Sequence, residues 1–288
     1  MTNKVALVTG ATDGIGKETA LQLAKAGATV IVHGRNPGKI EETVAQIKKA
    51  TGSERLDSVQ ADYASLDEVR KMAEHIKASY PHIHLLINNA GLFQIKRNET
   101  KDGFETTFGV NHLAPFLLTN LLLDTVKASA PARIVNVASM LHKNSKLDFD
   151  NLQLNTGFKG GLAYANSKVA NILFTRELAR RLEGTGVTAY AIHPGGVATG
   201  IGGPKNIGIA GVFFVLAKPF MDSIEDGAKT TLYCATSPDL EEVSGRYYAD
   251  SREKAPAKQA QDDETARRLW EVSEQLVGLA DAPGAASA

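Results

Sequence analysis

The stretch VALVTGATDGIG at residues 5–16 decides the fold, because it joins a short apolar strand to a glycine-rich turn and the start of a helix. The pattern predicts a strand over 4–9 and a helix over 14–26. Glycines at 10, 14 and 16 let the backbone turn sharply and approach a pyrophosphate, which the N–H groups and dipole of a helix N-terminus favour. The spacing G-x-x-x-G-x-G is a variant of the commoner dinucleotide-binding pattern, and tight packing without a ligand is the alternative interpretation.

The same alternation of strand and helix continues along the chain. Short β-branched runs at 29–33, 56–61, 83–87, 133–138 and 187–193 alternate with helical patterns at 37–50, 66–80, 106–128 and around Tyr164. The strands are apolar throughout, as expected when helices cover both faces of a parallel sheet. Repeated βα units predict an α/β, Rossmann-type, doubly wound parallel sheet. We expect a single domain over 1–280 and a disordered tail at 281–288, rich in Ala, Gly and Pro.

Composition excludes several classes of protein. The 32 basic residues balance 32 acidic ones, so no basic surface for nucleic acid is expected. The single cysteine, Cys234, excludes an internal disulfide and multi-cysteine metal sites, and His82 and His84 lack acidic or cysteine partners nearby, so no metal site is expected. The chain runs directly into its first strand, and its longest apolar run, 207–217, is too short to span a bilayer. These features predict a cytoplasmic protein without a transmembrane segment.

The end of the second strand indicates which dinucleotide is bound. A carboxylate at this position would bind the 2′-hydroxyl of the NAD ribose, but the chain has Gly34 followed by Arg35. An arginine suits a 2′-phosphate by its charge and its forked geometry. Arg35 therefore predicts NADP(H), with an ordinary solvated arginine as the alternative.

Tyr164 and Lys168 stand four residues apart, so a helix would place both side chains on one face. An ammonium one turn away should favour the phenolate and lower the tyrosine pKa. Such a phenol can donate and accept the proton in alcohol–carbonyl chemistry. The spacing alone is weak evidence and needs the context of the other motifs.

That context consists of four further blocks in a fixed order: Asn88-Asn89-Ala90-Gly91, Asn111, Ser139, and Pro194-Gly195-x-x-x-Thr199. With the glycine turn and the Tyr164–Lys168 pair, they closely resemble the short-chain dehydrogenase/reductase family. The resemblance covers nearly the whole chain. It implies the fold predicted above and an oxidoreductase activity.

The resemblance also implies site residues. The catalytic residues would be Asn111, Ser139, Tyr164 and Lys168. Tyr164 would exchange the proton, Lys168 would lower its pKa and bind the nicotinamide ribose, Ser139 would hold the carbonyl, and Asn111 would help hold a water. Ser139 as a strand-end cap and Asn111 as a helix-bending residue are the alternatives, and Asn88 is expected to be structural. The residues implied to bind the cofactor are Gly10, Thr12, Asp13, Gly14, Ile15, Gly16, Arg35, Asp62, Tyr63, Asn89, Ala90, Gly91, Tyr164, Lys168, Pro194, Gly195, Val197 and Thr199.

Within the family, three segments resemble the branch of the retinol dehydrogenases and the WW-domain oxidoreductase. They are the long stretch from Ser139 to Tyr164 and the sequences at 174–178 and 267–270. The family resemblance also makes 199–222 a mobile substrate lid, whose apolar centre suits a lipophilic substrate. A helix packed on the core or on a partner subunit, or shallow membrane contact, are the alternatives.

These observations predict an NADP(H)-dependent oxidoreductase that interconverts a carbonyl and an alcohol on an apolar small molecule. By family analogy it would be a homodimer or homotetramer. The alternatives are a ketoreductase of a bulkier, polar or polyketide-like substrate, and a cofactor-binding sensor or scaffold without turnover.

Overall fold

The computed structural model describes residues 1–196 and 223–279. The predicted lid at 199–222 and the predicted tail at 281–288 therefore lie outside the described residues, as do Val197 and Thr199. None of the helices in the described ranges combines the length and apolar character that a membrane span requires.

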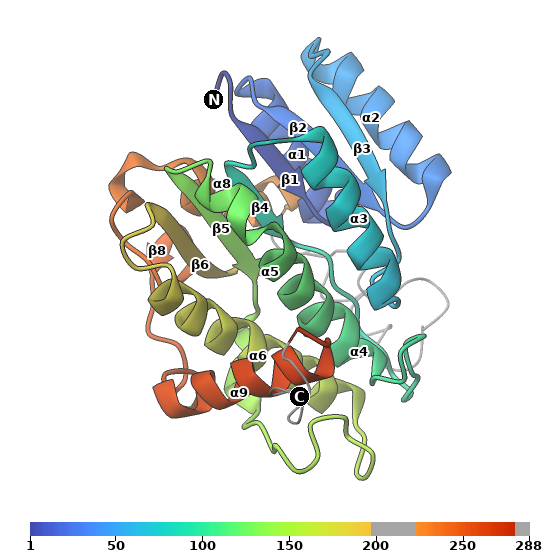
Figure 1. Cartoon of the computed structure of the whole chain (residues 1–288), viewed down its shortest axis with the longest axis vertical. Helices are drawn as coiled ribbons and strands as arrows, with labels where there is room; N and C mark the ends of the chain where they lie inside the picture. Colours follow the sequence, from blue (N-terminus) through green and yellow to red (C-terminus); the bar gives the residue numbers. More distant parts are fainter. Residues whose placement is uncertain (197–222, 280–288) are drawn as a thin grey trace, which may run out of the picture.

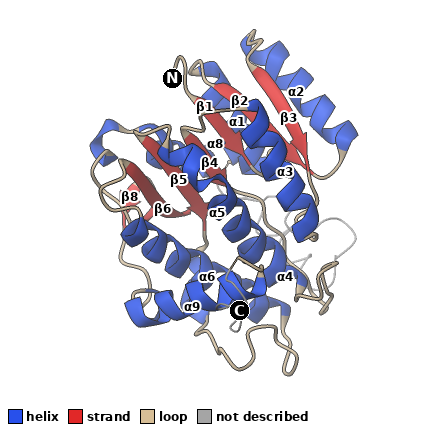
Figure 2. Cartoon of the chain, viewed as in Figure 1, coloured by secondary structure: helices blue, strands red, loops and turns tan. Residues whose placement is uncertain are grey.

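An eight-stranded sheet forms the centre of the described part of the chain (Figures 1 and 2). All neighbouring strands are parallel except the last pair, which is antiparallel. In sheet order the strands are β3 (Leu56–Gln60), β2 (Thr29–Gly34), β1 (Val5–Val8), β4 (Leu85–Asn88), β5 (Ala132–Val137), β6 (Val187–His193), β7 (Arg246–Ala249) and β8 (Arg252–Glu253). This order confirms the predicted doubly wound Rossmann-type sheet, because the chain moves outward from β1 to β3 and then returns to continue on the other side from β4.

Helices cover both faces of the sheet, and the strands are apolar on both sides for that reason. In β1, Leu7 belongs to one hydrophobic core, whereas Ala6 and Val8 belong to the other. The first core includes residues of α3 (Leu66–Ser79), α5 (Ala114–Lys127), α6 (Gly160–Arg181) and α9 (Asp263–Leu276). The second includes residues of α1 (Gly14–Lys25), α2 (Pro37–Thr51) and α8 (Ile224–Thr236). In Figure 1, α3, α5 and α6 lie in front of the sheet.

Local signals explain where the N-terminal helices begin. Asp13, Asn36 and Ser65 precede α1, α2 and α3, and each side chain accepts a hydrogen bond from a backbone N–H of the first turn. Helix α2 also has Pro37 at its first position and ends before Gly52, whose φ of 66° is readily adopted by glycine. The predicted helix starts were therefore close to the observed ones.

Two parts of the fold differ from the sequence-based expectations. The helix predicted over 106–128 is divided into α4 (Thr106–Phe108), a π-helix (Gly109–Leu113) and α5, because an i→i+5 turn leaves no mark in hydrophobic periodicity. Beyond residue 222 the patterns yielded no prediction, yet α8, β7, β8 and α9 form there. Helix α9 packs against α6, and its Trp270 ring centroid lies 4.9 Å from that of Phe116 and 5.7 Å from that of Phe174.

The packing of α9 gives a stability prediction. Trp270 is 3% exposed, so Trp270→Ala should lower the free energy of unfolding by about 3–5 kcal/mol through lost burial and an unfilled cavity. Urea denaturation monitored by circular dichroism measures the change. The neighbouring Glu271 is exposed, and Glu271→Ala should change stability by less than about 0.5 kcal/mol. Equal stabilities for the two variants would contradict the placement of α9 in the core.

Candidate active site

The predicted site residues meet at one edge of the sheet, because parallel strands present their carboxyl ends together. The glycine turn follows β1, Arg35 follows β2, Asp62 follows β3, Asn89 follows β4, Ser139 follows β5, and Pro194 follows β6. Sequence motifs separated by up to 184 positions are thus brought to a single edge of the fold.

The glycine turn is held tightly against the end of β4. Gly10 has a φ of 62°, and a Cβ atom at this position would lie 2.7 Å from the Cα atom of Ala90. A Cβ atom on Gly16 would clash with the carbonyl oxygen of Gly10 and with the Asn89 side chain. Packing alone therefore requires these glycines, and the same packing leaves the backbone of the turn bare, as close approach of a pyrophosphate requires.

Asn89 ties this turn to the neighbouring strand. Its Nδ2 donates to the carbonyl oxygens of Thr9 at 2.8 Å and Gly10 at 3.2 Å. The backbone N–H groups of Asn89 and Ala90 both donate to Thr9 Oγ1 at 3.0 Å. Gly91 follows, and a Cβ atom there would lie 3.7 Å from Lys168 Nζ. Residues 89–91 thus connect the glycine turn with Lys168.

Arg35 lies beside the glycine turn. A Cβ atom on Gly34 would lie 2.5 Å from Thr12 Cγ2, so the end of β2 touches the turn and places Arg35 next to it. The Arg35 side chain is exposed.

The Asp13 carboxylate accepts the Gly14 N–H at 2.7 Å and caps α1, so this side chain is engaged at the helix terminus. Ile15, in the first turn of α1, is buried.

The residues that follow β3 pack beside the glycine turn. Tyr63 is 4% exposed and stacks on His33 with ring centroids 4.7 Å apart, so the Tyr63 side chain lies beneath the surface. Asp62 Oδ1 accepts the Ala64 N–H at 3.0 Å.

His33 is a residue that sequence reasoning missed. Its Nδ1 accepts the Gly10 N–H at 3.2 Å, and its Nε2 donates to the Ala61 carbonyl at 3.1 Å. Burial lowers the pKa of His33 to about 4, which keeps the ring neutral as this pair of bonds requires. Its position at a strand end was the available signal, but its partners come from two other segments.

Tyr164 and Lys168 lie one turn apart on α6, as predicted. Lys168 Nζ is 5.3 Å from the centroid of the Tyr164 ring and donates to the Val137 carbonyl at the end of β5, at 2.9 Å. Both side chains are buried, with 9% and 3% of their surfaces exposed.

The expected lowering of the Tyr164 pKa is wrong in this structure. Burial raises the pKa of Tyr164 to about 12, although a hydrogen bond with Ser139 opposes the rise. Burial also lowers the pKa of Lys168 to about 8. The physical reason is that both groups are desolvated and the ammonium bonds to a backbone carbonyl rather than to the phenol oxygen.

Ser139 has a capping role, which is one of the two interpretations that the sequence left open. Its Oγ accepts the Leu141 N–H at 3.3 Å and caps the 3₁₀ helix Met140–Asn144. The Ser139 side chain also lies close enough to the Tyr164 hydroxyl to oppose the rise of its pKa.

Asn111 sits within the π-helix and uses its amide group on the neighbouring loop. Its Oδ1 accepts the Leu92 N–H at 2.8 Å, while its Nδ2 donates to the Leu92 carbonyl at 2.9 Å and to Ser167 Oγ at 3.1 Å. The side chain therefore joins the loop after β4 to α6. Asn88 is structural as expected, because its buried Nδ2 donates to Thr119 and Asn136.

Apolar side chains occur in the segments next to Tyr164 and Ser139. The Phe93 ring packs edge-on against Tyr164 at 5.9 Å. Of the four large apolar side chains classed as exposed among the described residues, three lie in segments next to Ser139 and Phe93: Met140, Leu141 and Ile95, with exposed fractions of 52%, 42% and 45%. We call Phe93, Ile95, Met140 and Leu141 the apolar rim.

Two further predicted cofactor-binding residues lie at the end of the sixth strand. Pro194 and Gly195 follow β6, and Gly195 has a φ of 93°. Within the described residues, His, Cys, Asp and Glu side chains form no group of three suited to a metal ion.

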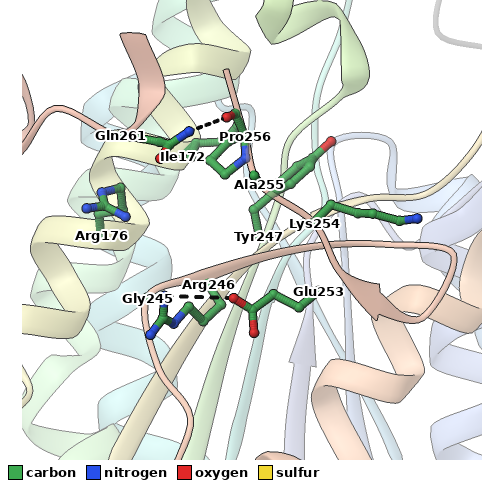
Figure 3. Close-up of a pocket in the computed structure, with 10 residues that line it drawn as sticks. All are labelled: Ile172, Arg176, Gly245, Arg246, Tyr247, Glu253, Lys254, Ala255, Pro256 and Gln261. Atoms are coloured by element: carbon green, nitrogen blue, oxygen red, sulfur yellow. Dashed lines mark hydrogen bonds and ion pairs between the residues drawn. The ribbon is translucent and has the colours of Figure 1, made fainter. Parts of the chain in front are cut away.

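A cavity of about 150 Å³ lies between α6 and the β7–β8 hairpin (Figure 3), and its lining contains none of the predicted site residues.

Comparisons with known proteins agree with this geometry. A family model described as short chain dehydrogenase matches residues 4–208. Mouse retinol dehydrogenase 12 is 45% identical over 276 residues, covering 96% of this chain and 87% of the relative. Human retinol dehydrogenase 13 is 44% identical over 287 residues, covering 96% and 85% of the two chains.

Solved structures share the fold. An uncharacterised protein from Mycobacterium paratuberculosis superposes with a TM-score of 0.78 at 31% identity, covering 96% of this chain and 94% of that one. A short chain dehydrogenase from Shigella flexneri, crystallised with NADP, has a TM-score of 0.70 at 24% identity over 88% of this chain and 98% of its own. The extent of the family match and of these identities shows that the chain belongs to the short-chain dehydrogenase family, and that its relatives include retinol dehydrogenases.

Proposed function

We propose that this oxidoreductase uses NADP(H) to interconvert a carbonyl and an alcohol on an apolar small molecule, with Tyr164 as the proton donor and acceptor. The observation that carries the proposal is the convergence of Ser139, Tyr164 and Lys168 beside a glycine turn, at the edge of the sheet where ligands bind in such folds.

The residues present fit a dinucleotide. The bare backbone of residues 10–16 and the start of α1 suit a pyrophosphate, and Arg35 suits a 2′-phosphate. Asn89, Ala90 and Gly91 would line the next part of the site, with Lys168 beyond Gly91. The bound cofactor supplies the hydride chemistry, and the protein supplies binding, orientation and charge.

The protonation states suit reduction of a carbonyl. With a pKa of about 12, Tyr164 is a protonated phenol at neutral pH and can donate its proton to a substrate oxygen. The phenolate left behind would be stabilised by the ammonium of Lys168, whose Nζ is 5.3 Å from the ring centroid. Ser139 would hydrogen-bond the same substrate oxygen and hold it beside the phenol.

The apolar rim supports a lipophilic substrate. Water-exposed Met140 and Leu141 directly follow Ser139, so a substrate held by this serine would bury them. The names of the retinol dehydrogenase relatives agree with a substrate of this class. A homodimer or homotetramer and residence in the cytoplasm stay predictions; light scattering and cell fractionation test them.

Removing the proton donor tests the mechanism. Tyr164→Phe keeps the ring that packs on Phe93 but removes the hydroxyl, so reduction of long-chain aldehydes should fall by at least about 100-fold. NADPH affinity, measured by fluorescence titration, should stay within a few-fold. Activity near the wild-type level would exclude the proton-transfer role, and NADPH binding by a wild-type chain that turns over no aldehyde or ketone would favour the sensor alternative.

Reversing the charge at Arg35 tests the cofactor preference. Arg35→Asp should raise the apparent KM for NADPH at least about tenfold, because a carboxylate repels a 2′-phosphate, and should leave the KM for NADH nearly unchanged. Lys49→Asp, in the last turn of α2, makes the same charge change away from the site. Equal effects of Arg35→Asp on both cofactors would contradict the assignment.

The charge of Lys168 predicts a pH dependence. Its pKa is lowered to about 8, so the ammonium is present below that pH and lost above it. The kcat for aldehyde reduction should therefore decline as pH rises through about 8. A guanidinium keeps its charge throughout this range, so Lys168→Arg should remove this decline even if its kcat is lower. A wild-type profile that stays flat from pH 7 to 10 would rule out the charge as a contributor.

A further inference from the structure

A buried histidine lies directly behind the candidate catalytic serine. His142 is in the 3₁₀ helix that Ser139 caps, and none of its surface is exposed. The proposed mechanism gives it no role. A buried titratable side chain usually carries specific hydrogen bonds, because leaving its polar atoms unpaired is costly.

The hydrogen bonds of His142 define its tautomer. The Ala257 N–H donates to Nε2 at 3.0 Å, so Nε2 must carry the lone pair. Nδ1 then carries the proton and donates to the carbonyl oxygen of Ser139 at 2.6 Å. Burial lowers the pKa of His142, and Lys143 adds to this effect, so the neutral ring that both bonds need is the stable form.

The group that binds Nε2 belongs to a segment at 254–260, which we call the strap. It follows β8, and its Lys254 N–H donates to the Tyr247 carbonyl at 2.9 Å. The Tyr247 ring packs edge-on against His142, with centroids 5.1 Å apart. Figure 3 shows Ala255 and Pro256 of the strap next to Tyr247 and to Ile172 of α6.

The strap also holds the far end of the 3₁₀ helix. Gln259 Nε2 donates to the Ser145 carbonyl at 2.8 Å and to the His142 carbonyl at 3.3 Å. The Ser145 hydroxyl bonds in turn to Asn166, two residues after Tyr164. The turn that carries Ser139 is therefore fixed at both ends.

We propose that His142 is a positioning residue. Its two hydrogen bonds connect the strap to the turn that carries Ser139, and they keep the Ser139 hydroxyl beside Tyr164. The inference rests on the proposed function, because it assigns Ser139 a place in catalysis. Ser139 Oγ accepts from Leu141 of the same turn, so a shift of the turn would displace the hydroxyl from Tyr164. Displacements of about 1 Å near reacting groups reduce rates by up to about 100-fold.

A spectrum of the full chain tests the tautomer without any turnover. In the chain labelled with ¹⁵N-histidine, the signals lost in His142→Asn identify His142. Long-range ¹H–¹⁵N correlations at pH 7 should show a protonated Nδ1 and an unprotonated Nε2. A ring protonated on Nε2, or on both nitrogens, would overturn the inference.

Two substitutions separate the two hydrogen bonds. His142→Asn keeps a donor at the position of Nδ1, whereas His142→Gln keeps an acceptor near the position of Nε2. Each variant breaks one of the two bonds that connect the strap to Ser139, so kcat should fall by about tenfold or more in both. NADPH affinity should be unchanged in both, because neither alters the glycine turn.

His84→Gln is the matched control, because His84 Nδ1 also accepts a backbone N–H, from Val5, which glutamine does not replace, but His84 lies at the opposite end of the sheet. It should lower the thermal midpoint and leave kcat unchanged. If both His142 variants lower the midpoint while their kcat matches that of the wild type, His142 is only structural and the inference fails. A wild-type chain without turnover would contradict the proposed function instead, and the spectrum alone would then decide the His142–Ser139 bond.

Discussion

The hydrogen bonds between Asn89 and the turn after β1 are the constraint on which the site depends. They lie where the strand order reverses, between β1 and β4. The Asn89 amide fills the space that a side chain at position 16 would need, so this position must be a glycine. With this point fixed, the loop through Gly91 delivers Leu92 to Asn111, and the cofactor end of the site is joined to the catalytic end.

Burial, rather than attraction between charges, sets the protonation of the catalytic pair. A lysine one turn from a tyrosine suggested a lowered phenol pKa, but that expectation omitted the cost of desolvating both charges. The pKa of Lys168 is about 8 and that of Tyr164 is about 12. The phenol therefore keeps its proton over the whole pH range in which the ammonium is charged. Under the proposed mechanism, the ammonium would stabilise the phenolate that forms during proton transfer, which is when charge stabilisation lowers the barrier.

Sequence predicted the features that follow from local pattern and missed those that depend on tertiary contacts. Continuous apolar strands and the glycine-rich turn led to the right sheet and to the start of α1. The π-helix around Asn111 leaves no mark in hydrophobic periodicity, and the bonds from Asn111 to Leu92 and Ser167 join segments distant in sequence. Helix α9, by contrast, has the local pattern of an amphipathic helix, with Asp262 as its cap and with Leu269 and Trp270 buried on one face. The strap carries mixed polar sequence, and its placement depends on a bond to the His142 ring. The roles of His33 and His142 were hidden for the same reason, since a histidine's partners determine its tautomer.

These two histidines show how the fold fixes both ends of the site by the same chemical means. A neutral imidazole has one donor and one acceptor, so it can join two backbone groups from segments that share no strand or helix. His33 joins Gly10 to Ala61 at the cofactor end, and His142 joins Ser139 to Ala257 at the catalytic end. An aliphatic side chain would leave the N–H groups of Gly10 and Ala257 without these acceptors, and a lysine would offer donors alone. Burial keeps each ring neutral, and the N–H donor and carbonyl acceptor that it joins then determine which nitrogen carries the proton.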